Sequence, residues 1–136
     1  MAHEINVKVR FSETDALGHI SNISYFIYLE EARTEFFGAL GFGMEIKDWN
    51  IILASAKCDF VSQGYFNQKL KVTSEVSRIG NSSFTIVHQI VDEEDGTLIA
   101  IGEASAVYFN FQDQKSEKIP ESFRAELEKH MVKETA

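Results

Sequence analysis

The chain has 136 residues, enough for one globular domain with a full hydrophobic core and too few for a second domain of ordinary size. Its 21 acidic and 13 basic side chains give a net charge of −8, which disfavours a nucleic-acid groove or an anionic membrane surface as the partner. The single cysteine excludes an internal disulfide and any metal site built from several cysteines. We therefore expect one domain over residues 1–136 in the cytoplasm, without membrane insertion.

The first third of the chain predicts a strand, a loop and a long helix. Apolar side chains alternate with polar ones from Ile5 to Phe11, a period of two that is typical of a half-buried strand. The next ten residues are rich in small and polar side chains and break this period, so we expect a loop. From about Asn22 to Leu40, apolar residues recur every three or four positions, as along one face of a helix that Gly41 can end.

The remainder of the chain predicts strands joined largely by hairpins. Extended runs follow at 51–61, 70–76, 84–91 and 97–111. Gly80 and Asn81 lie between the second and third runs and Asp95 and Gly96 precede the fourth. These four residues tolerate positive φ and suit hairpin turns. Pro120 predicts the start of a short C-terminal helix that carries Phe123, Leu127 and Met131 on one face.

The last long run, 97–111, has two unusual faces. One face is small, with Ala100, Gly102, Ala104 and Ala106, and permits close approach by the helix or by a neighbouring subunit's strand. The other face carries apolar residues that a monomer would expose, which predicts a homo-oligomer. These apolar residues are Ile99, Ile101, Val107 and Phe109.

The order of the elements predicts the fold class. One strand, one long helix and four further strands favour an α+β domain in which an antiparallel five-stranded sheet curls around one long central helix.

The stretch V-R-F-S-E-T-D-A-L-G-H-I-S-N-I-S-Y, from Val9 to Tyr25, is followed by E-E-A-R from Glu30 to Arg33. This pattern resembles the signature of hotdog-fold acyl-CoA thioesterases and is most similar to the 4-hydroxybenzoyl-CoA thioesterase-like group. The resemblance runs over nearly the whole chain. It implies a hotdog fold, hydrolysis of an acyl-CoA to a carboxylic acid and free coenzyme A, and a tetramer of two dimers. Coenzyme A is then part of the substrate, and no separate cofactor or metal is implied.

The resemblance places the catalytic carboxylate at Asp15. Thioester hydrolysis needs a base that deprotonates water or a carboxylate that attacks the carbonyl, and Asp15 fits either role. The unpaired backbone N–H groups at the start of the helix, around Asn22 and Ile23, can stabilise the oxyanion. A simpler interpretation is that Asp15 only closes a turn between strand and helix, but the surrounding motif favours catalysis.

Three further groups near this motif have two interpretations each. His19 can orient the thioester or transfer a proton, although a role in holding the loop is favoured. Tyr25 can contact substrate or simply pack in the core. Glu30 and Glu31 lie where some hotdog thioesterases carry their carboxylate, but an ion pair between Glu30 and Arg33 is the favoured interpretation.

An acidic protein must gather cations locally to bind the phosphates of coenzyme A. Lys69, Lys71 and Arg78 lie around one predicted strand, and the turn after it offers hydroxyl and N–H donors. Arg78, Ser82 and Ser83 match positions of the family's nucleotide-contacting hairpin. A solvated hairpin tip without ligand explains the same composition equally well.

Other functions remain open from these residues. The scattered histidines predict no metal site, and Cys58 in an apolar strand is typical of an unreactive thiol. A hydratase or dehydratase acting on acyl thioesters and a non-catalytic acyl-thioester binding module are the alternatives. Phe26, Tyr65 and Phe66 can shape the acyl pocket from either subunit of an oligomer.

Overall fold

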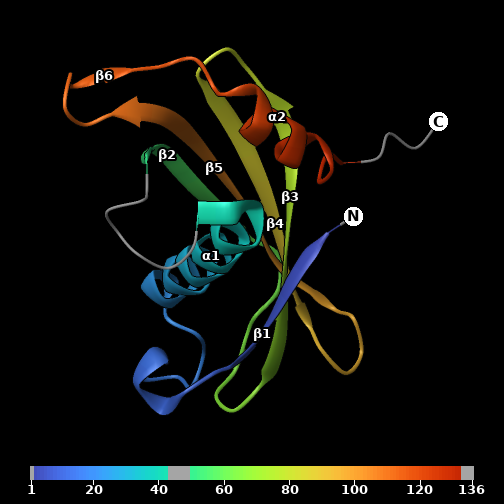
Figure 1. The fold of residues 1–136 in the computed structure, drawn as a ribbon. Helices are drawn as coiled ribbons and strands as arrows, with labels where there is room; N and C mark the ends of the chain where they lie inside the picture. The colour runs from blue at the N-terminus through green and yellow to red at the C-terminus, as the bar shows by residue number, and fades with distance from the viewer. Residues whose placement is uncertain (1, 43–49, 133–136) are drawn as a thin grey trace.

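The computed structural model describes residues 2–42 and 50–132, in which a curled antiparallel sheet wraps around one long helix (Figure 1). The order of the strands across the sheet is β1-β3-β4-β5-β2. The predicted five strands and central helix are confirmed; a two-residue strand, β6 (Lys115–Ser116), also pairs with the end of β5. The main elements are β1 (His3–Lys8), α1 (Asn22–Phe37), β2 (Ile51–Phe60), β3 (Lys69–Ile79), β4 (Ser83–Asp92), β5 (Leu98–Asn110) and α2 (Glu121–Glu128).

The wide apolar face of α1 packs on the concave face of the sheet and forms most of the core. The predicted small face of β5 lies under this helix: a Cβ atom on Gly102 would be 2.7 Å from both Cδ atoms of Leu29. Glycine is therefore required at 102 for the helix to sit this close to the sheet. The helix and the sheet share two buried clusters, one around Tyr25, Tyr28, Leu29 and Ala32 and one around Phe36, Phe37 and Leu40.

Several element ends differ from the prediction. β1 ends at Lys8, and a single 3₁₀ turn, η1 (Phe11–Glu13), occupies the start of the predicted loop. α1 ends at Phe37 and continues into a π-helical turn, η2 (Gly38–Phe42), where Gly41 has a φ of 108°. Most of the turn predicted before residue 50 lies outside the described residues.

The two predicted hairpin turns are present, but only one uses a positive φ. Gly96 has a φ of 76°, as predicted, whereas neither Gly80 nor Asn81 enters the left-handed region. Space explains glycine at 80, because a Cβ there would lie 2.8 Å from the Arg78 guanidinium and 3.2 Å from the Ser83 carbonyl oxygen. Gly80 and Asn81 thus lie in the predicted hairpin turn without using the positive φ that they tolerate.

The C-terminal helix is shorter than predicted. Pro120 is the residue that precedes α2, and Phe123 and Leu127 are buried against the sheet, as expected. Met131 lies beyond the helix, where the chain forms a parallel bridge with Val76 of β3.

β1 and β2 lie at the two edges of the sheet. β5 lies between β4 and β2, and Ile99 is only 1% exposed because it belongs to the core. The prediction that Ile99 lies on the exposed apolar face of β5 is therefore wrong, whereas Ile101 on that face is 37% exposed. Exposed apolar side chains also gather along β2, at Ile52, Leu53 and Phe60. No helix in the described parts of the chain has the length and hydropathy to cross a membrane.

Candidate active site

Asp15 is exposed and belongs to the segment between β1 and α1. This segment lies at the lower end of the sheet in Figure 1. Its backbone N–H donates to the His19 carbonyl oxygen at 2.8 Å, and its side-chain Oδ1 accepts from the N–H groups of Leu17 at 2.9 Å and His19 at 3.2 Å. The predicted turn-closing role is thus present. Because Oδ1 alone accepts these bonds, Oδ2 remains available for chemistry at an orientation that the turn holds in place.

A second loop, residues 61–68, supports the Asp15 loop. The Ile20 N–H donates to the Gly64 carbonyl oxygen at 2.9 Å, and the Phe66 N–H donates to that of Gly18 at 3.1 Å. The ring of His19 packs edge-on against Tyr65, with 5.3 Å between the centroids. These contacts favour the loop-holding role for His19.

Unpaired backbone donors lie where α1 begins. Ser21 precedes the helix without a side-chain cap, so the N–H groups of Asn22 and Ile23 have no acceptor in the first turn. The Ser21 N–H itself donates to the Glu13 carbonyl oxygen at 2.9 Å, which ties the helix start to the loop that carries Asp15. Both Asn22 and Ile23 are exposed. The positive end of the helix dipole and two free donors therefore lie at the same end of the sheet as Asp15.

A cavity of about 260 Å³ opens beside this helix start. Tyr25 is one of its walls: the side chain is only 3% exposed, and its ring packs on Phe60 with 5.0 Å between the centroids. Burial raises the pKa of the Tyr25 hydroxyl, so Tyr25 is better suited to line the cavity than to donate a proton. The cavity is lined by Ile20, Asn22, Tyr25, Phe60, Val61, Ser62 and Gln63.

Glu13 is the residue at this site that the sequence did not reveal. It is only 7% exposed, and its carboxylate accepts hydrogen bonds from the Arg10 backbone at 2.9 Å, the Arg10 guanidinium at 2.9 and 3.2 Å and the Tyr28 hydroxyl at 3.0 Å. Its backbone carbonyl oxygen accepts from the Ser24 hydroxyl at 2.9 Å. Burial raises the pKa of Glu13, but the hydrogen bonds outweigh burial and hold it below its ordinary value. Glu13 thus joins the strand end, the loop and α1.

The predicted nucleotide hairpin lies at the opposite end of the sheet (Figure 1). Arg78 donates to the Ser83 hydroxyl at 3.0 Å, and Ser82 lies beside them in the turn between β3 and β4. β3 begins beside the Asp15 loop, and its ten steps from Lys69 to Ile79 span roughly 33 Å. Within one chain, the structure therefore does not bring Arg78, Ser82 and Ser83 to Asp15.

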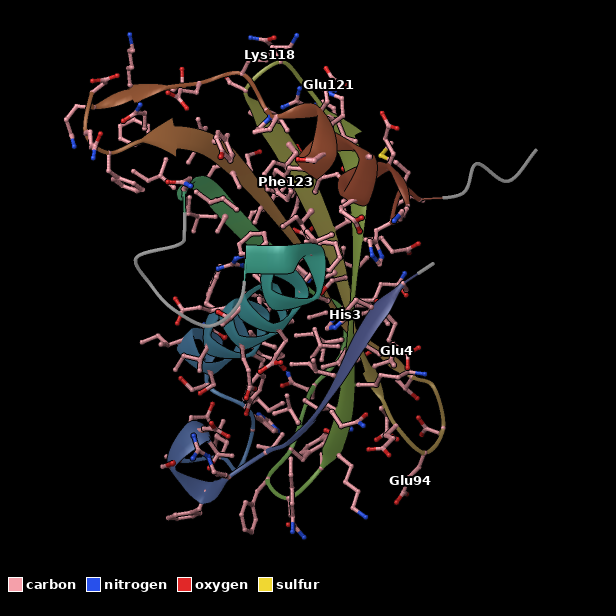
Figure 2. The ribbon with its side chains drawn as sticks, in the orientation of Figure 1. His3, Glu4, Glu94, Lys118, Glu121 and Phe123 are labelled. Atoms are coloured by element: carbon pink, nitrogen blue, oxygen red, sulfur yellow. The ribbon has the colours of Figure 1, made fainter. Side chains whose placement is uncertain are left out.

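The same strand length separates the predicted cations. Lys69 and Lys71 lie at the start of β3 and Arg78 near its end, so the expectation that they form one basic patch is wrong. Labelled residues mark the two ends of the sheet in Figure 2. Glu94 lies at one end, in the turn after β4, and Lys118 and Glu121 lie at the opposite end, beside α2.

The predicted ion pair on α1 is also wrong. Glu30 and Glu31 are exposed and Arg33 is buried, and no ion pair within 4 Å joins Arg33 to Glu30 among the described residues; the Glu30 charge acts on Arg33 only at longer range, where it raises the pKa that burial lowers. Cys58 is half-buried, and burial raises its pKa to about 11, which fits an unreactive thiol. The described residues contain no cluster of three or more His, Cys, Asp or Glu side chains suited to a metal ion.

The geometry can be compared with known proteins. The family model of the thioesterase-like superfamily matches residues 9–127. The chain belongs to this superfamily. It is 31% identical over 121 residues to the uncharacterized protein YsmA of Bacillus subtilis (strain 168), covering 83% of this chain and 82% of YsmA.

Two solved structures of the same class support this assignment. A predicted thioesterase from Bacillus stearothermophilus is 31% identical and superimposes with a TM-score of 0.91, over 99% of this chain and all of that one. The gentisyl-coenzyme A thioesterase BH1999 is 26% identical with a TM-score of 0.80, over 92% of this chain and 99% of that one. The predicted hotdog fold and the predicted thioester hydrolase are confirmed.

Proposed function

We propose that this thioesterase hydrolyses an acyl-CoA to a carboxylic acid and free coenzyme A, with Asp15 as the catalytic carboxylate. The observation that carries the proposal is the position of Asp15: its Oδ2 is free, and the unpaired N–H groups of Asn22 and Ile23 lie at the same end of the sheet. Asp15 either removes a proton from the attacking water or attacks the carbonyl carbon itself. The N–H groups stabilise the oxyanion, the carbon–sulfur bond breaks, and the departing thiolate of coenzyme A takes up a proton. In the first route the water oxygen becomes part of the carboxylic acid; in the second, a water molecule hydrolyses the mixed anhydride between the acyl group and Asp15, which releases the acid and regenerates the carboxylate.

The cavity beside the helix start is the proposed acyl site. Tyr25 and Phe60 give it aromatic walls, and Ser62 and Gln63 give it a polar rim. A small aromatic acyl group suits these walls, and the gentisyl-coenzyme A thioesterase among the structural relatives supports that choice. The cytoplasm is the proposed location, consistent with the absence of any disulfide partner for Cys58.

Release of free thiol tests the proposed reaction. Aromatic and aliphatic acyl-CoAs are incubated with the purified protein and a thiol-reactive dye, and the carboxylic acid is measured in parallel. We expect equal amounts of thiol and acid. A hydratase or dehydratase would change the acyl group without releasing thiol, and a binding module would do neither, so either result would contradict hydrolysis.

The β3–β4 hairpin is proposed to contact the nucleotide end of coenzyme A. Arg78→Ala and Ser82→Ala should each raise KM several-fold while kcat changes little, because contacts far from the thioester are equal in ground and transition states. Kinetics with an acyl-CoA and with an acyl-pantetheine that lacks the phosphates provide the measurement. Lys129→Ala, which removes an exposed cation of α2 that pairs with Glu126, is the control. An equal loss on both substrates would remove the hairpin from the coenzyme A site.

We further propose a homo-oligomer, a dimer or a tetramer of two dimers, in which each site uses two chains. The exposed edge of β2 needs a cover, and a two-fold axis beside it would reverse the partner's sheet and bring the partner's hairpin to the Asp15 end. Light scattering at micromolar concentration should therefore give a mass of at least twice 15.4 kDa. A fully active species of 15.4 kDa would contradict both the oligomer and the shared site.

A further inference from the structure

The Gln68 side chain joins the loop 61–68, which supports the Asp15 loop, to the sheet. Its amide oxygen accepts from the Tyr65 backbone N–H at 2.9 Å, and its amide nitrogen donates to Oδ2 of Asp92 at 2.7 Å. Gln68 directly precedes β3, and Asp92 is the last residue of β4, the middle strand of the sheet. One carboxamide therefore links the supporting loop to the middle strand.

Asp92 offers Gln68 an acceptor in a fixed orientation. Its other oxygen, Oδ1, accepts from the N–H groups of Glu94 at 2.8 Å and Asp95 at 3.1 Å, so the turn after β4 holds the carboxylate in place. The hydrogen bond from Gln68, followed by these two, holds the pKa of Asp92 below its ordinary value. Because the acceptor is ionised, the bond from the Gln68 amide is stronger than a bond between neutral groups.

A short antiparallel bridge between Tyr65 and His19 connects the supporting loop to the Asp15 loop. The N–H groups of Ile20 and Phe66 make its two backbone hydrogen bonds, at 2.9 and 3.1 Å. The His19 N–H then donates to Oδ1 of Asp15 at 3.2 Å. Hydrogen bonds and one paired bridge therefore lead without a gap from the end of β4 to the Asp15 carboxylate.

Backbone hydrogen bonds hold the two ends of the loop 61–68 independently of the Gln68 side chain. The N–H groups of Val61 and Ser62 both donate to the Ile99 carbonyl oxygen, at 2.9 and 3.0 Å, which fixes the part of the loop that lines the proposed acyl cavity. At the other end, the Val9 N–H donates to the Gln68 carbonyl oxygen at 2.9 Å. The Gln68 side chain therefore controls the middle of the loop, where the bridge lies, and a variant at this position should still fold.

We infer that Gln68 and Asp92 are positioning residues for the hydrolysis: their hydrogen bond holds the loop 61–68, and through it the Asp15 loop, in the orientation that the reaction needs. This inference rests on the proposed role of Asp15. A base or nucleophile loses much of its effect when it moves by a fraction of an ångström, so a looser support lowers kcat although neither residue touches the substrate. KM should change less, because the wall of the acyl cavity has its own backbone bonds.

Reversing the direction of the hydrogen bond tests the pair. Gln68→Glu still accepts from the Tyr65 N–H but places a second carboxylate opposite Asp92, so kcat should fall about tenfold while KM changes less than about threefold. Asp92→Asn removes the charged acceptor and should lower kcat several-fold. In the double variant, Gln68→Glu with Asp92→Asn, the introduced amide can donate to the introduced carboxylate, and the net charge is that of wild type. Its kcat should return to within about threefold of wild type.

Two further variants separate the lost bond from the added charge. Gln68→Met removes both side-chain hydrogen bonds without adding a charge and should also lower kcat about tenfold. Gln89→Glu adds the same charge at an exposed position of the same strand, β4, and should leave kcat and KM unchanged. Circular dichroism verifies that each variant is folded.

Hydrogen exchange of the Ile20 and Phe66 backbone N–H groups, measured by NMR, reports the bridge without reference to activity. Faster exchange and lower kcat in Gln68→Glu, both recovered in the double variant, would support the inference. Wild-type kcat in folded Gln68→Met, or a double variant no better than Gln68→Glu, would overturn it. If wild-type protein released no thiol, the proposed reaction would be overturned, whereas faster exchange in Gln68→Glu would still support the holding of the loop by this pair.

Discussion

Asp15→Asn should lower kcat for thioester hydrolysis about a thousandfold, equivalent to about 4 kcal/mol of transition-state stabilisation, while the fold is retained. The amide oxygen can still accept the hydrogen bonds from the Leu17 and His19 N–H groups, so the turn keeps its shape. The charge that activates water or attacks the carbonyl is lost. Steady-state thiol release, with circular dichroism on the same samples, is the measurement.

Asp95→Asn is a matched control for this variant. Asp95 is also exposed, and its Oδ1 accepts from the N–H group two residues ahead, that of Thr97, at 2.9 Å, just as Asp15 does from Leu17. The same change in the same kind of turn should leave kcat unchanged. If Asp15→Asn kept near wild-type turnover with a normal spectrum, Asp15 would be structural, and Glu30 and Glu31 would become the candidate carboxylates.

Glu13→Ala should lower the free energy of unfolding by about 3 kcal/mol. The substitution leaves the buried Tyr28 hydroxyl without an acceptor and frees the Arg10 guanidinium. It also loosens the segment that connects β1 to α1, so we expect a lower kcat even at temperatures where the protein is folded. Urea unfolding gives the stability. Tyr28→Phe, which removes only the hydroxyl, should lower it by about 1 kcal/mol.

The effect of Glu13 should depend on pH in a defined direction. Its pKa in the folded protein lies below the ordinary value of 4.5, so the ionised carboxylate stabilises the fold above that value. This contribution is lost as the pH falls through the pKa of the folded state. The stability difference between wild type and Glu13→Ala should therefore be largest near neutral pH and shrink in acid. A difference that did not vary with pH would contradict the assigned role of the charge.

Periodicity predicted the architecture because each element buries a whole face. The three- and four-residue spacing of α1 and the small residues around Gly102 both follow from packing one helix on one sheet, and both are confirmed. Element ends were predicted less well. α1 ends at Phe37 instead of Leu40 because a π-helical turn, which leaves no mark in apolar spacing, takes over there.

The candidate site was predicted only where a continuous motif carries it. Asp15 and the helix start fall in one stretch of sequence, whereas the bond from Tyr28 to Glu13 joins residues fifteen positions apart and leaves no local pattern. Glu30 and Arg33 have the spacing of an ion pair, but spacing does not say which way a side chain turns. The sequence order likewise placed Lys71 close to Arg78, although an extended strand carries them far apart.

The close packing of α1 on β5 limits the path that an acyl chain can take. With Leu29 packed directly over Gly102, no tunnel can pass between the helix and the sheet at this level. A chain too long for the cavity beside Tyr25 has to turn sideways, along the flank of α1 that faces β2. In the proposed oligomer, chain-length selectivity would be set where the two subunits meet, by side chains such as Phe26, and could change without any alteration to the catalytic loop.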